Sequence, residues 1–151
     1  MKNNPLRKRV GAMLVATGIL SRGLALQTLS EKGFDITSEQ YLILSLLVEQ
    51  GELYQRQISE LTYKDRSNVS RIINILEEKE FVKRINDSNG RKIFKIVVTE
   101  KGKQLREKIH PVMVDIRKVM TKGISKEELE NCLQTLEKML ENMKDKVKLQ
   151  I

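Results

Sequence analysis

The chain has 151 residues, which is enough for one modest domain with an oligomerisation arm but not for two catalytic domains. Lys and Arg number 28 against 20 Asp and Glu, and the formal charge of +8 favours a polyanionic partner such as nucleic acid or anionic lipid. A single Cys and a single His exclude an intrachain disulfide framework and a structural zinc site built from these residues. Because no glycine-rich phosphate loop, nucleophile elbow or H-E-x-x-H motif occurs either, we expect no enzyme activity, no metal and no cofactor.

The positive charge is concentrated in particular segments of the chain. Residues 1–32 carry +5, whereas residues 33–53 carry −4. Residues 54–98 and 99–124 carry +4 each, and the remaining 27 residues are nearly neutral. This distribution indicates a patterned surface rather than uniform basic solubilisation.

The N-terminal segment places basic residues before an apolar run from Val10 to Leu20, as a signal peptide does. However, no small-x-small cleavage site follows, and Arg22 stands soon after the run. The run is also shorter than the roughly 20 residues of a transmembrane helix. We therefore predict a cytoplasmic protein that does not enter a membrane, with a helix from about Leu6 to Lys32 whose broad apolar face needs a partner.

The next segment has the pattern of a helix-turn-helix. Thr37 and Gln40 form a capping box that opens a helix over residues 38–50. A two-turn helix over 55–62 follows, with Ile58 and Leu61 as its apolar positions. Asp65 can then cap a longer helix over 66–79. A short helix, a tight turn and a longer helix in this order are typical of DNA-binding helix-turn-helix units.

The predicted helix over 66–79 has two contrasting faces. Helical spacing places four apolar residues on one face and a polar set on the other; the apolar set is Val69, Ile72, Ile73 and Leu76, and the polar set is Ser67, Ser70, Arg71 and Asn74. The polar set is either an ordinary solvated face or a surface that contacts bases and phosphates. Carboxylates cluster at the C-terminal end of the helix, which favours DNA contact by its N-terminal half.

A β-hairpin is predicted after this helix. Residues 81–85 form the first strand, and residues 91–98 form the second with Phe94, Ile96 and Val98 alternating toward one face. Asn89-Gly90 between them is a strong hairpin-turn signal. Arg91 and Lys92 lie near the tip, where they either enter the minor groove of DNA or keep a sheet edge soluble. Beside a helix-turn-helix, such a ribbon is expected to act as a wing.

Two helices complete the chain. Thr99 is expected to cap the first, with a bend or break at Pro111 and an end at Gly123. A capping box at Ser125 opens the last helix, whose apolar residues follow a 3-4 spacing as far as Val147. A winged domain of some sixty residues cannot cover this stripe and that of the first helix, so we expect a homodimer built from both chain ends.

The order of these elements resembles the MarR family of bacterial transcriptional regulators over nearly the whole chain. The similarity rests on three sequence segments: Ser67-Asn68-Val69-Ser70-Arg71, Leu76-Glu77-Glu78-Lys79-Glu80-Phe81-Val82-Lys83-Arg84, and Val98-Thr99-Glu100-Lys101-Gly102. Three positions depart from the family pattern. Glu80 replaces a helix-ending Gly, Asn89 replaces a wing Asp for which Asp87 is a potential substitute, and Val98 replaces a frequent Leu.

The resemblance implies a mainly α fold with a small β-hairpin wing. Residues 37–99 are the expected winged helix-turn-helix domain, and 1–36 with 100–151 the helical dimerisation region. The implied partners are a pseudo-palindromic double-stranded DNA operator, a second copy of the chain, and an aromatic or phenolic small molecule whose pocket residues remain unassigned. The implied activity is that of a transcriptional regulator, and we expect a repressor rather than an activator.

The resemblance also assigns roles to individual residues. The expected major-groove contacts are Ser67, Asn68, Ser70, Arg71 and Asn74. Arg91 and Lys92 are expected in the minor groove, and Arg66, Lys83 and Arg84 at phosphates. Cys132 is expected to be a small buried hydrophobe rather than a redox sensor, and His110 to have a surface or packing role rather than to line a ligand pocket.

Two other functions fit parts of the sequence. A winged helix used for protein assembly would bind duplex DNA weakly, with a shallow dependence on salt. A basic amphipathic protein at a membrane surface would bind liposomes. Two features argue against the membrane hypothesis: the capping boxes that contain carboxylates, and the β-hairpin wing in the middle of the chain.

Overall fold

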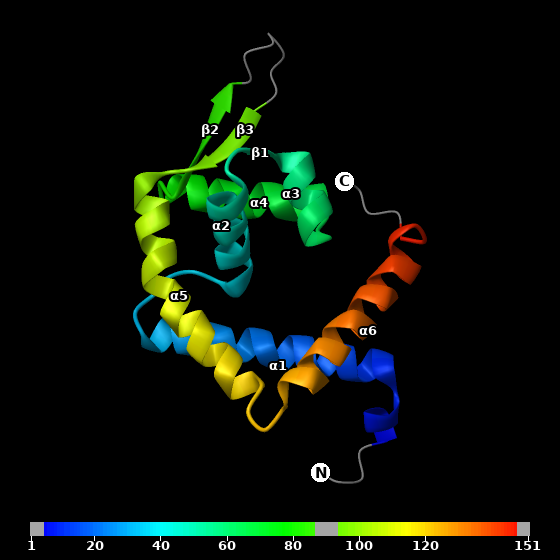
Figure 1. Cartoon of the computed structure of the whole chain (residues 1–151). Helices are drawn as coiled ribbons and strands as arrows, with labels where there is room; N and C mark the ends of the chain where they lie inside the picture. The colour runs from blue at the N-terminus through cyan, green and yellow to red at the C-terminus, as the bar shows by residue number, and fades with distance from the viewer. Residues whose placement is uncertain (1–4, 87–93, 148–151) are drawn as a thin grey trace.

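The computed structural model describes residues 5–86 and 94–147. Its described part is mainly helical with a small antiparallel sheet, as predicted, and Figure 1 shows the arrangement. The elements in chain order are η1 (Pro5–Lys8), α1 (Val10–Glu31), α2 (Ser38–Gln50), β1 (Leu53–Tyr54), α3 (Gln55–Thr62), α4 (Arg66–Glu78), β2 (Val82–Asn86), β3 (Phe94–Val98), α5 (Glu100–Met120) and α6 (Lys126–Lys144).

The elements form two regions that α5 connects. Helices α2, α3 and α4 gather beside the sheet, while α1 lies across the opposite end of the molecule. Helix α5 leaves the sheet, packs against α2 and reaches α1, and α6 then turns back and rises away from α1 (Figure 1). The helix-turn-helix is thereby mounted on α5, which joins it to the helices at the two chain ends.

The sheet has three strands in the order β1-β3-β2, all antiparallel to their neighbours. Val82 pairs with Val98 and Asn86 with Phe94, so β2 and β3 form the predicted hairpin. Leu53 and Tyr54 fall between the helices predicted over 38–50 and 55–62, where no strand was predicted, and they pair with Ile96 and Lys95 of β3. The wing is therefore attached to the helix-turn-helix by a third strand rather than standing as a two-stranded ribbon.

The core lies between the helix-turn-helix, the sheet and α5. It is filled by aliphatic side chains from α2, α4 and α5, including Ile43, Leu44, Leu47, Val69, Ile73, Leu76, Ile109 and Val112. Val82 and Ile96 extend it under the sheet. Each fully buried aliphatic side chain contributes roughly 1.5–3 kcal/mol by its removal from water. The core fixes α4 against α2 and so determines which face of α4 remains exposed.

Side-chain caps begin four of the helices at the predicted positions. Thr37 and Gln40 form a reciprocal box at α2, and Ser125 with Glu128 does the same at α6. The Asp65 carboxylate accepts from the Asn68 backbone N–H at α4, and the Thr99 hydroxyl accepts from that of Gly102 at α5. Each cap satisfies a backbone donor that the helix itself leaves free.

The turn from α4 into β2 uses a glutamate in a conformation that favours glycine. Glu80 has φ 62°, and the Phe81 N–H closes the turn on the Leu76 carbonyl oxygen at 2.8 Å. The left-handed conformation that a helix-ending glycine would adopt is thus kept although Glu80 replaces the glycine. Lys101 lies 2.9 Å from the Glu80 carboxylate and holds its pKa below the usual value, while the Thr99 hydroxyl donates to the Glu80 carbonyl oxygen at 2.7 Å. The start of α5 thereby stabilises the unusual backbone.

Several predicted boundaries were wrong. The N-terminal helix does not begin at Leu6, because Arg9 is extended and separates a 3-10 turn from α1. Helix α5 runs through Pro111 without a break, since Pro111 is exposed and water can satisfy the carbonyl group that proline leaves free. Helix α5 ends at Met120 rather than at Gly123, and α6 ends before Val147.

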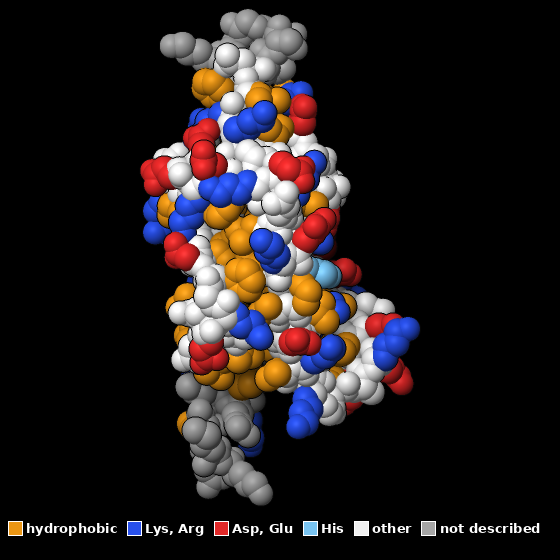
Figure 2. Space-filling view, turned by 90° about the vertical axis from the view of Figure 1, so that its left-hand side faces the viewer, with side chains coloured by type: hydrophobic (Ala, Val, Ile, Leu, Met, Phe, Trp, Pro, Cys, Tyr) orange, Lys and Arg blue, Asp and Glu red, His pale blue; other side chains and the backbone are white. Residues whose placement is uncertain are grey.

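The helices at the chain ends expose large apolar side chains. Leu20 of α1 is 73% exposed and Leu133 of α6 is 61% exposed, and α6 has no buried residue. Figure 2 shows hydrophobic side chains gathered over the lower half of one face of the molecule. Cys132, on the apolar stripe of α6, is also exposed in the single chain, so its predicted burial depends on a partner that covers this stripe. These faces need a covering that the described part of one chain does not provide.

Helix α1 is long and apolar enough, by length and composition, to cross a membrane. The expectation that the N-terminal run is too short for this was wrong, because the helix continues past Arg22 to Glu31 with few charged residues. Core helices of soluble proteins and N-terminal signal sequences have the same properties. Length and composition alone therefore assign α1 to neither environment.

Candidate nucleic-acid interface

Helices α3 and α4 form the predicted helix-turn-helix. Helix α3 ends at Thr62, and Tyr63 follows in the left-handed region at φ 53°, which reverses the chain within a few residues. Ile58 is fully buried, but the prediction that Leu61 shares its face was wrong, because Leu61 is 54% exposed and Ser59 is buried instead. Packing against α4 and β1 selects a face of this short helix that the apolar spacing does not reveal.

Helix α4 has the two faces that its sequence predicts. Val69, Ile72, Ile73 and Leu76 are buried. Of the opposite polar set, Ser67, Arg71 and Asn74 are exposed and Ser70 is half-buried, as is the neighbouring Asn68. The exposed face carries hydroxyl, amide and guanidinium groups, which bond to base edges and phosphates.

The N-terminus of α4 is held by Asp65. Its carboxylate accepts from the Ser67 hydroxyl at 2.7 Å and from the Asn68 N–H at 2.8 Å. These bonds lower the pKa of Asp65, the Ser67 hydroxyl having the largest effect. Because the Ser67 hydrogen is donated to Asp65, its hydroxyl oxygen is left to accept from a partner. The cap thereby fixes the first turn of the helix, where base contacts concentrate.

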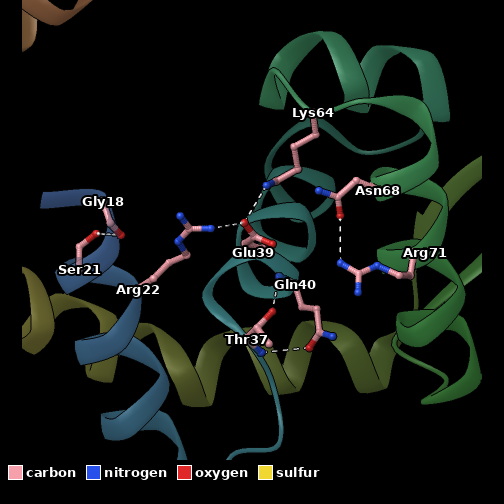
Figure 3. A network of polar contacts seen from close by, with 9 residues as sticks. All are labelled: Gly18, Ser21, Arg22, Thr37, Glu39, Gln40, Lys64, Asn68 and Arg71. Carbon is pink, nitrogen blue, oxygen red and sulfur yellow. Dashed lines mark hydrogen bonds and ion pairs between the residues drawn. The ribbon is translucent and has the colours of Figure 1, made fainter. Parts of the chain in front are cut away.

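Polar contacts lie on the exposed face of α4 and, separately, between α1, α2 and the turn before α4 (Figure 3). The Arg71 guanidinium donates to the Asn68 amide oxygen at 3.3 Å. On α2, Glu39 accepts from Lys64 at 2.9 Å and lies 3.5 Å from Arg22 of α1. Glu39 therefore links α1 to the turn that precedes α4.

Arg84 of the wing is engaged by α4. Its guanidinium pairs with the Glu77 carboxylate and donates to the Asn74 amide oxygen at 2.6 Å. Glu77 also accepts the Arg84 backbone N–H at 3.1 Å. The Arg84 side chain is only 25% exposed, in contrast to the exposed Lys83 and Arg66. The three residues predicted as phosphate contacts thus have different surroundings.

The predicted wing tip lies outside the described residues. This applies to Arg91 and Lys92, and also to Asp87, Asn89 and Gly90 of the predicted turn. The described strands β2 and β3 lead toward this segment from the sheet. A minor-groove role for Arg91 and Lys92 therefore stays a prediction.

A pocket of about 320 Å³ lies between α1, α2 and α4. Leu26, Ile72 and Ile75 supply apolar walls, Arg22 and Arg71 supply guanidinium groups, and Glu39, 3.5 Å from Arg22, supplies a carboxylate. Sequence reasoning did not find this site, because its residues come from three helices and share no local motif. His110 is exposed on α5 and does not line this pocket; its Nδ1 lies 3.3 Å from the Tyr41 hydroxyl.

The fold and the exposed face of α4 define a winged helix-turn-helix protein of the DNA-binding type. Residues 36–94 match the model of the MarR family. A curated relative is 28% identical over 127 residues, covering 83% of this chain and 85% of its own: an uncharacterized HTH-type transcriptional regulator, YybA of Bacillus subtilis. Residues 36–94 therefore form a MarR-type winged helix-turn-helix domain, and the chain is similar over most of its length to an HTH-type transcriptional regulator.

Solved structures share the fold. Bordetella bronchiseptica BpsR, whose DNA binding is regulated by 6-hydroxynicotinic acid, has a TM-score of 0.81 at 21% identity, covering 90% of this chain and 96% of that chain. A mutant of E. coli MarR complexed with operator DNA has a TM-score of 0.80 at 20% identity, covering 91% and 99%. These similarities extend beyond the winged domain to most of the helices at the two ends of the chain.

Proposed function

We propose that the protein is a cytoplasmic, homodimeric transcriptional repressor that binds a pseudo-palindromic DNA operator and responds to a small-molecule effector. The observation that carries this proposal is the exposed polar face of α4. This face begins at an ordered cap and opposes a fully apolar buried face. Glu77 and Glu78 stand at its far end, so the N-terminal half of α4 carries no carboxylate after the capping Asp65.

The proposed major-groove contacts are Ser67, Asn68, Ser70, Arg71 and Asn74. Arg71 has the longest reach of these side chains, and it is exposed. If it contacts a guanine in bidentate geometry, Arg71→Ala weakens binding to the operator by about 1–3 kcal/mol and relaxes base preference at one position per half-site. Titration of operator and unrelated duplexes tests this role. Equal losses on both duplexes would assign Arg71 to a phosphate instead.

The proposed dimer interface covers the exposed apolar faces of α1 and α6. Because α6 buries no residue within the chain, its removal leaves the core of one protomer intact. Truncation after Gly123 is therefore expected to abolish dimerisation while the helix-turn-helix stays folded. Sedimentation measures the mass and far-ultraviolet circular dichroism the folding. A monodisperse dimer of the truncated chain would contradict the two-ended interface.

The proposed effector site is the pocket between α1, α2 and α4. Its apolar walls suit an aromatic ring, and Arg22 and Arg71 suit a phenolate or carboxylate group. Because Arg71 is also a proposed base contact, a ligand that holds it in the pocket would withdraw it from DNA. This competition supplies a direct physical route from ligand binding to operator release.

Simple aromatic carboxylates and phenols serve as probes of this pocket. Arg22→Met is expected to weaken the effect of an active probe on operator binding and to leave binding without the probe unchanged. Arg117→Met removes the same charge from an exposed position of α5 and serves as the matched control. Equal responses of wild type and both variants to an active probe would place the effector elsewhere.

A further inference from the structure

The tie between the wing and α4 fixes how Asn74 presents its amide. A guanidinium group has hydrogen-bond donors and no acceptor, so the Asn74 atom that Arg84 contacts at 2.6 Å must be the amide oxygen. A flipped amide would set Nδ2 hydrogens against guanidinium hydrogens. Arg84 takes one of the two lone pairs of this oxygen and draws electron density from it, so the oxygen is a weaker acceptor for a second donor, and the Nδ2 hydrogens are the stronger groups that the exposed Asn74 offers to a partner.

Arg84 itself is held in place by Glu77. The Glu77 carboxylate accepts from both the side chain and the backbone N–H of Arg84, so two bonds join β2 to α4 at this point. The Arg84 side chain is three-quarters buried, and a carboxylate balances its charge. A guanidinium in this setting is poorly available to a phosphate, in contrast to the adjacent and exposed Lys83.

An asparagine with a free amide prefers different DNA bases from an asparagine whose amide oxygen already accepts a hydrogen bond. A free amide contacts adenine through two bonds, accepting from N6 and donating to N7. An amide whose oxygen already accepts from a guanidinium acts mainly as a donor, and it best matches edges that only accept, which are O6 and N7 of guanine and O4 of thymine. The partner of the Asn74 oxygen therefore decides which bases this position of α4 favours.

We infer that Arg84 is a positioning residue that sets base specificity through Asn74, making this position favour guanine or thymine over adenine, rather than a phosphate contact. The inference rests on the proposed binding of α4 in the major groove. It assigns the wing a role in major-groove readout, through β2, that is separate from any contact made by the wing tip.

Selection of duplexes from a randomised pool by the full-length protein tests this inference. Arg84→Met keeps the length of the side chain but removes its donors, so the Asn74 amide is released. Adenine is then expected to gain about fivefold or more over guanine and thymine at one position per half-site, the lower end of what a bidentate contact supplies. The slope of log affinity against log salt stays at the wild-type value, because no phosphate contact is lost.

Lys83→Met is the matched control, since it removes one charge from the neighbouring exposed residue of β2. It is expected to keep the base preference and to lower the salt slope by about one unit if Lys83 contacts a phosphate. Arg84→Lys retains the charge but replaces the planar fork by a point charge, so it is expected to shift base preference in the same direction as Arg84→Met. Arg84→Lys also keeps the test valid if Arg84→Met fails to fold.

Three outcomes would overturn the inference. They are a base preference that Arg84→Met and Arg84→Lys leave unchanged, a loss on all sequences with a lower salt slope, and a shift in preference that persists when Asn74 is replaced by alanine. Failure of the wild-type protein to select any sequence would instead overturn the proposed function. The two failures are thus distinguishable within one set of selections.

Discussion

The close approach of α5 to the turn after α4 leads to a sharp prediction for Gly102. This glycine lies in the first turn of α5 and is buried, and its N–H donates to the Thr99 cap. A Cβ atom at this position would overlap the Phe81 carbonyl oxygen and lie 2.9 Å from Val98 Cγ2. The Phe81 carbonyl also accepts the Thr99 N–H at 3.0 Å, so it cannot move away without breaking a bond at the base of the wing.

Gly102→Ala is therefore expected to lower the free energy of unfolding. Overpacking of a buried site costs typically about 1–3 kcal/mol. The better helix propensity of alanine offsets up to about 1 kcal/mol of this. Because the overlapped atom is a backbone carbonyl oxygen held by a hydrogen bond, the cost lies at the upper end of this range, and a net loss of about 2 kcal/mol remains, which corresponds to a decrease in Tm of roughly 4–8 °C for a chain of this size.

Thermal and urea unfolding at one fixed protein concentration measure this loss, because dimerisation makes Tm depend on concentration. Gly18→Ala in α1 is the matched control, since a Cβ there meets nothing within 4 Å in the single chain. It is expected to be neutral or stabilising by up to about 1 kcal/mol. A Gly102→Ala protein as stable as wild type would refute the close packing of α5 against the turn after α4.

Two further predictions concern the wing tip and the α4 cap. Arg91→Ala is expected to lower the slope of log affinity against log salt by about one unit, because the contact proposed for Arg91 displaces one counterion; an unchanged slope would remove this residue from the interface. The pKa of Asp65 is lowered in the folded protein, so its stabilising contribution is present above the ordinary aspartate pKa and is lost as the pH falls through the lowered folded value. The difference in Tm between wild type and Asp65→Asn, which caps without titrating, should therefore change as the pH falls from about 5 to about 2; a difference that stays constant over this range would show that the Asp65 charge does not stabilise α4.

Local chemistry explains why much of the fold was predictable from the sequence. The caps at Thr37, Asp65, Thr99 and Ser125 act within three residues of the chain, so their side chains reveal helix starts directly. The apolar face of α4 was predictable for a similar reason, because helical spacing alone separates Val69 from Arg71.

Long-range packing explains what the sequence did not reveal. Strand β1 exists because Leu53 pairs with Ile96, a residue 43 positions later. The engagement of Arg84 by Glu77 and Asn74 likewise depends on how β2 folds back on α4, so Arg84 resembled the exposed Lys83 in the sequence. The pocket that combines Arg22 with Arg71 required the relative placement of three helices.

The most direct test of the central claim is recovery of genomic DNA fragments by the purified full-length protein at near-physiological salt. We predict enrichment of a few fragments that share a pseudo-palindrome, with half-sites about one helical turn apart. The enrichment should fall for Arg71→Ala, with base preference lost at one position of each half-site. Uniform recovery of fragments, or equal recovery by wild type and Arg71→Ala, would contradict sequence-specific DNA binding through the exposed face of α4.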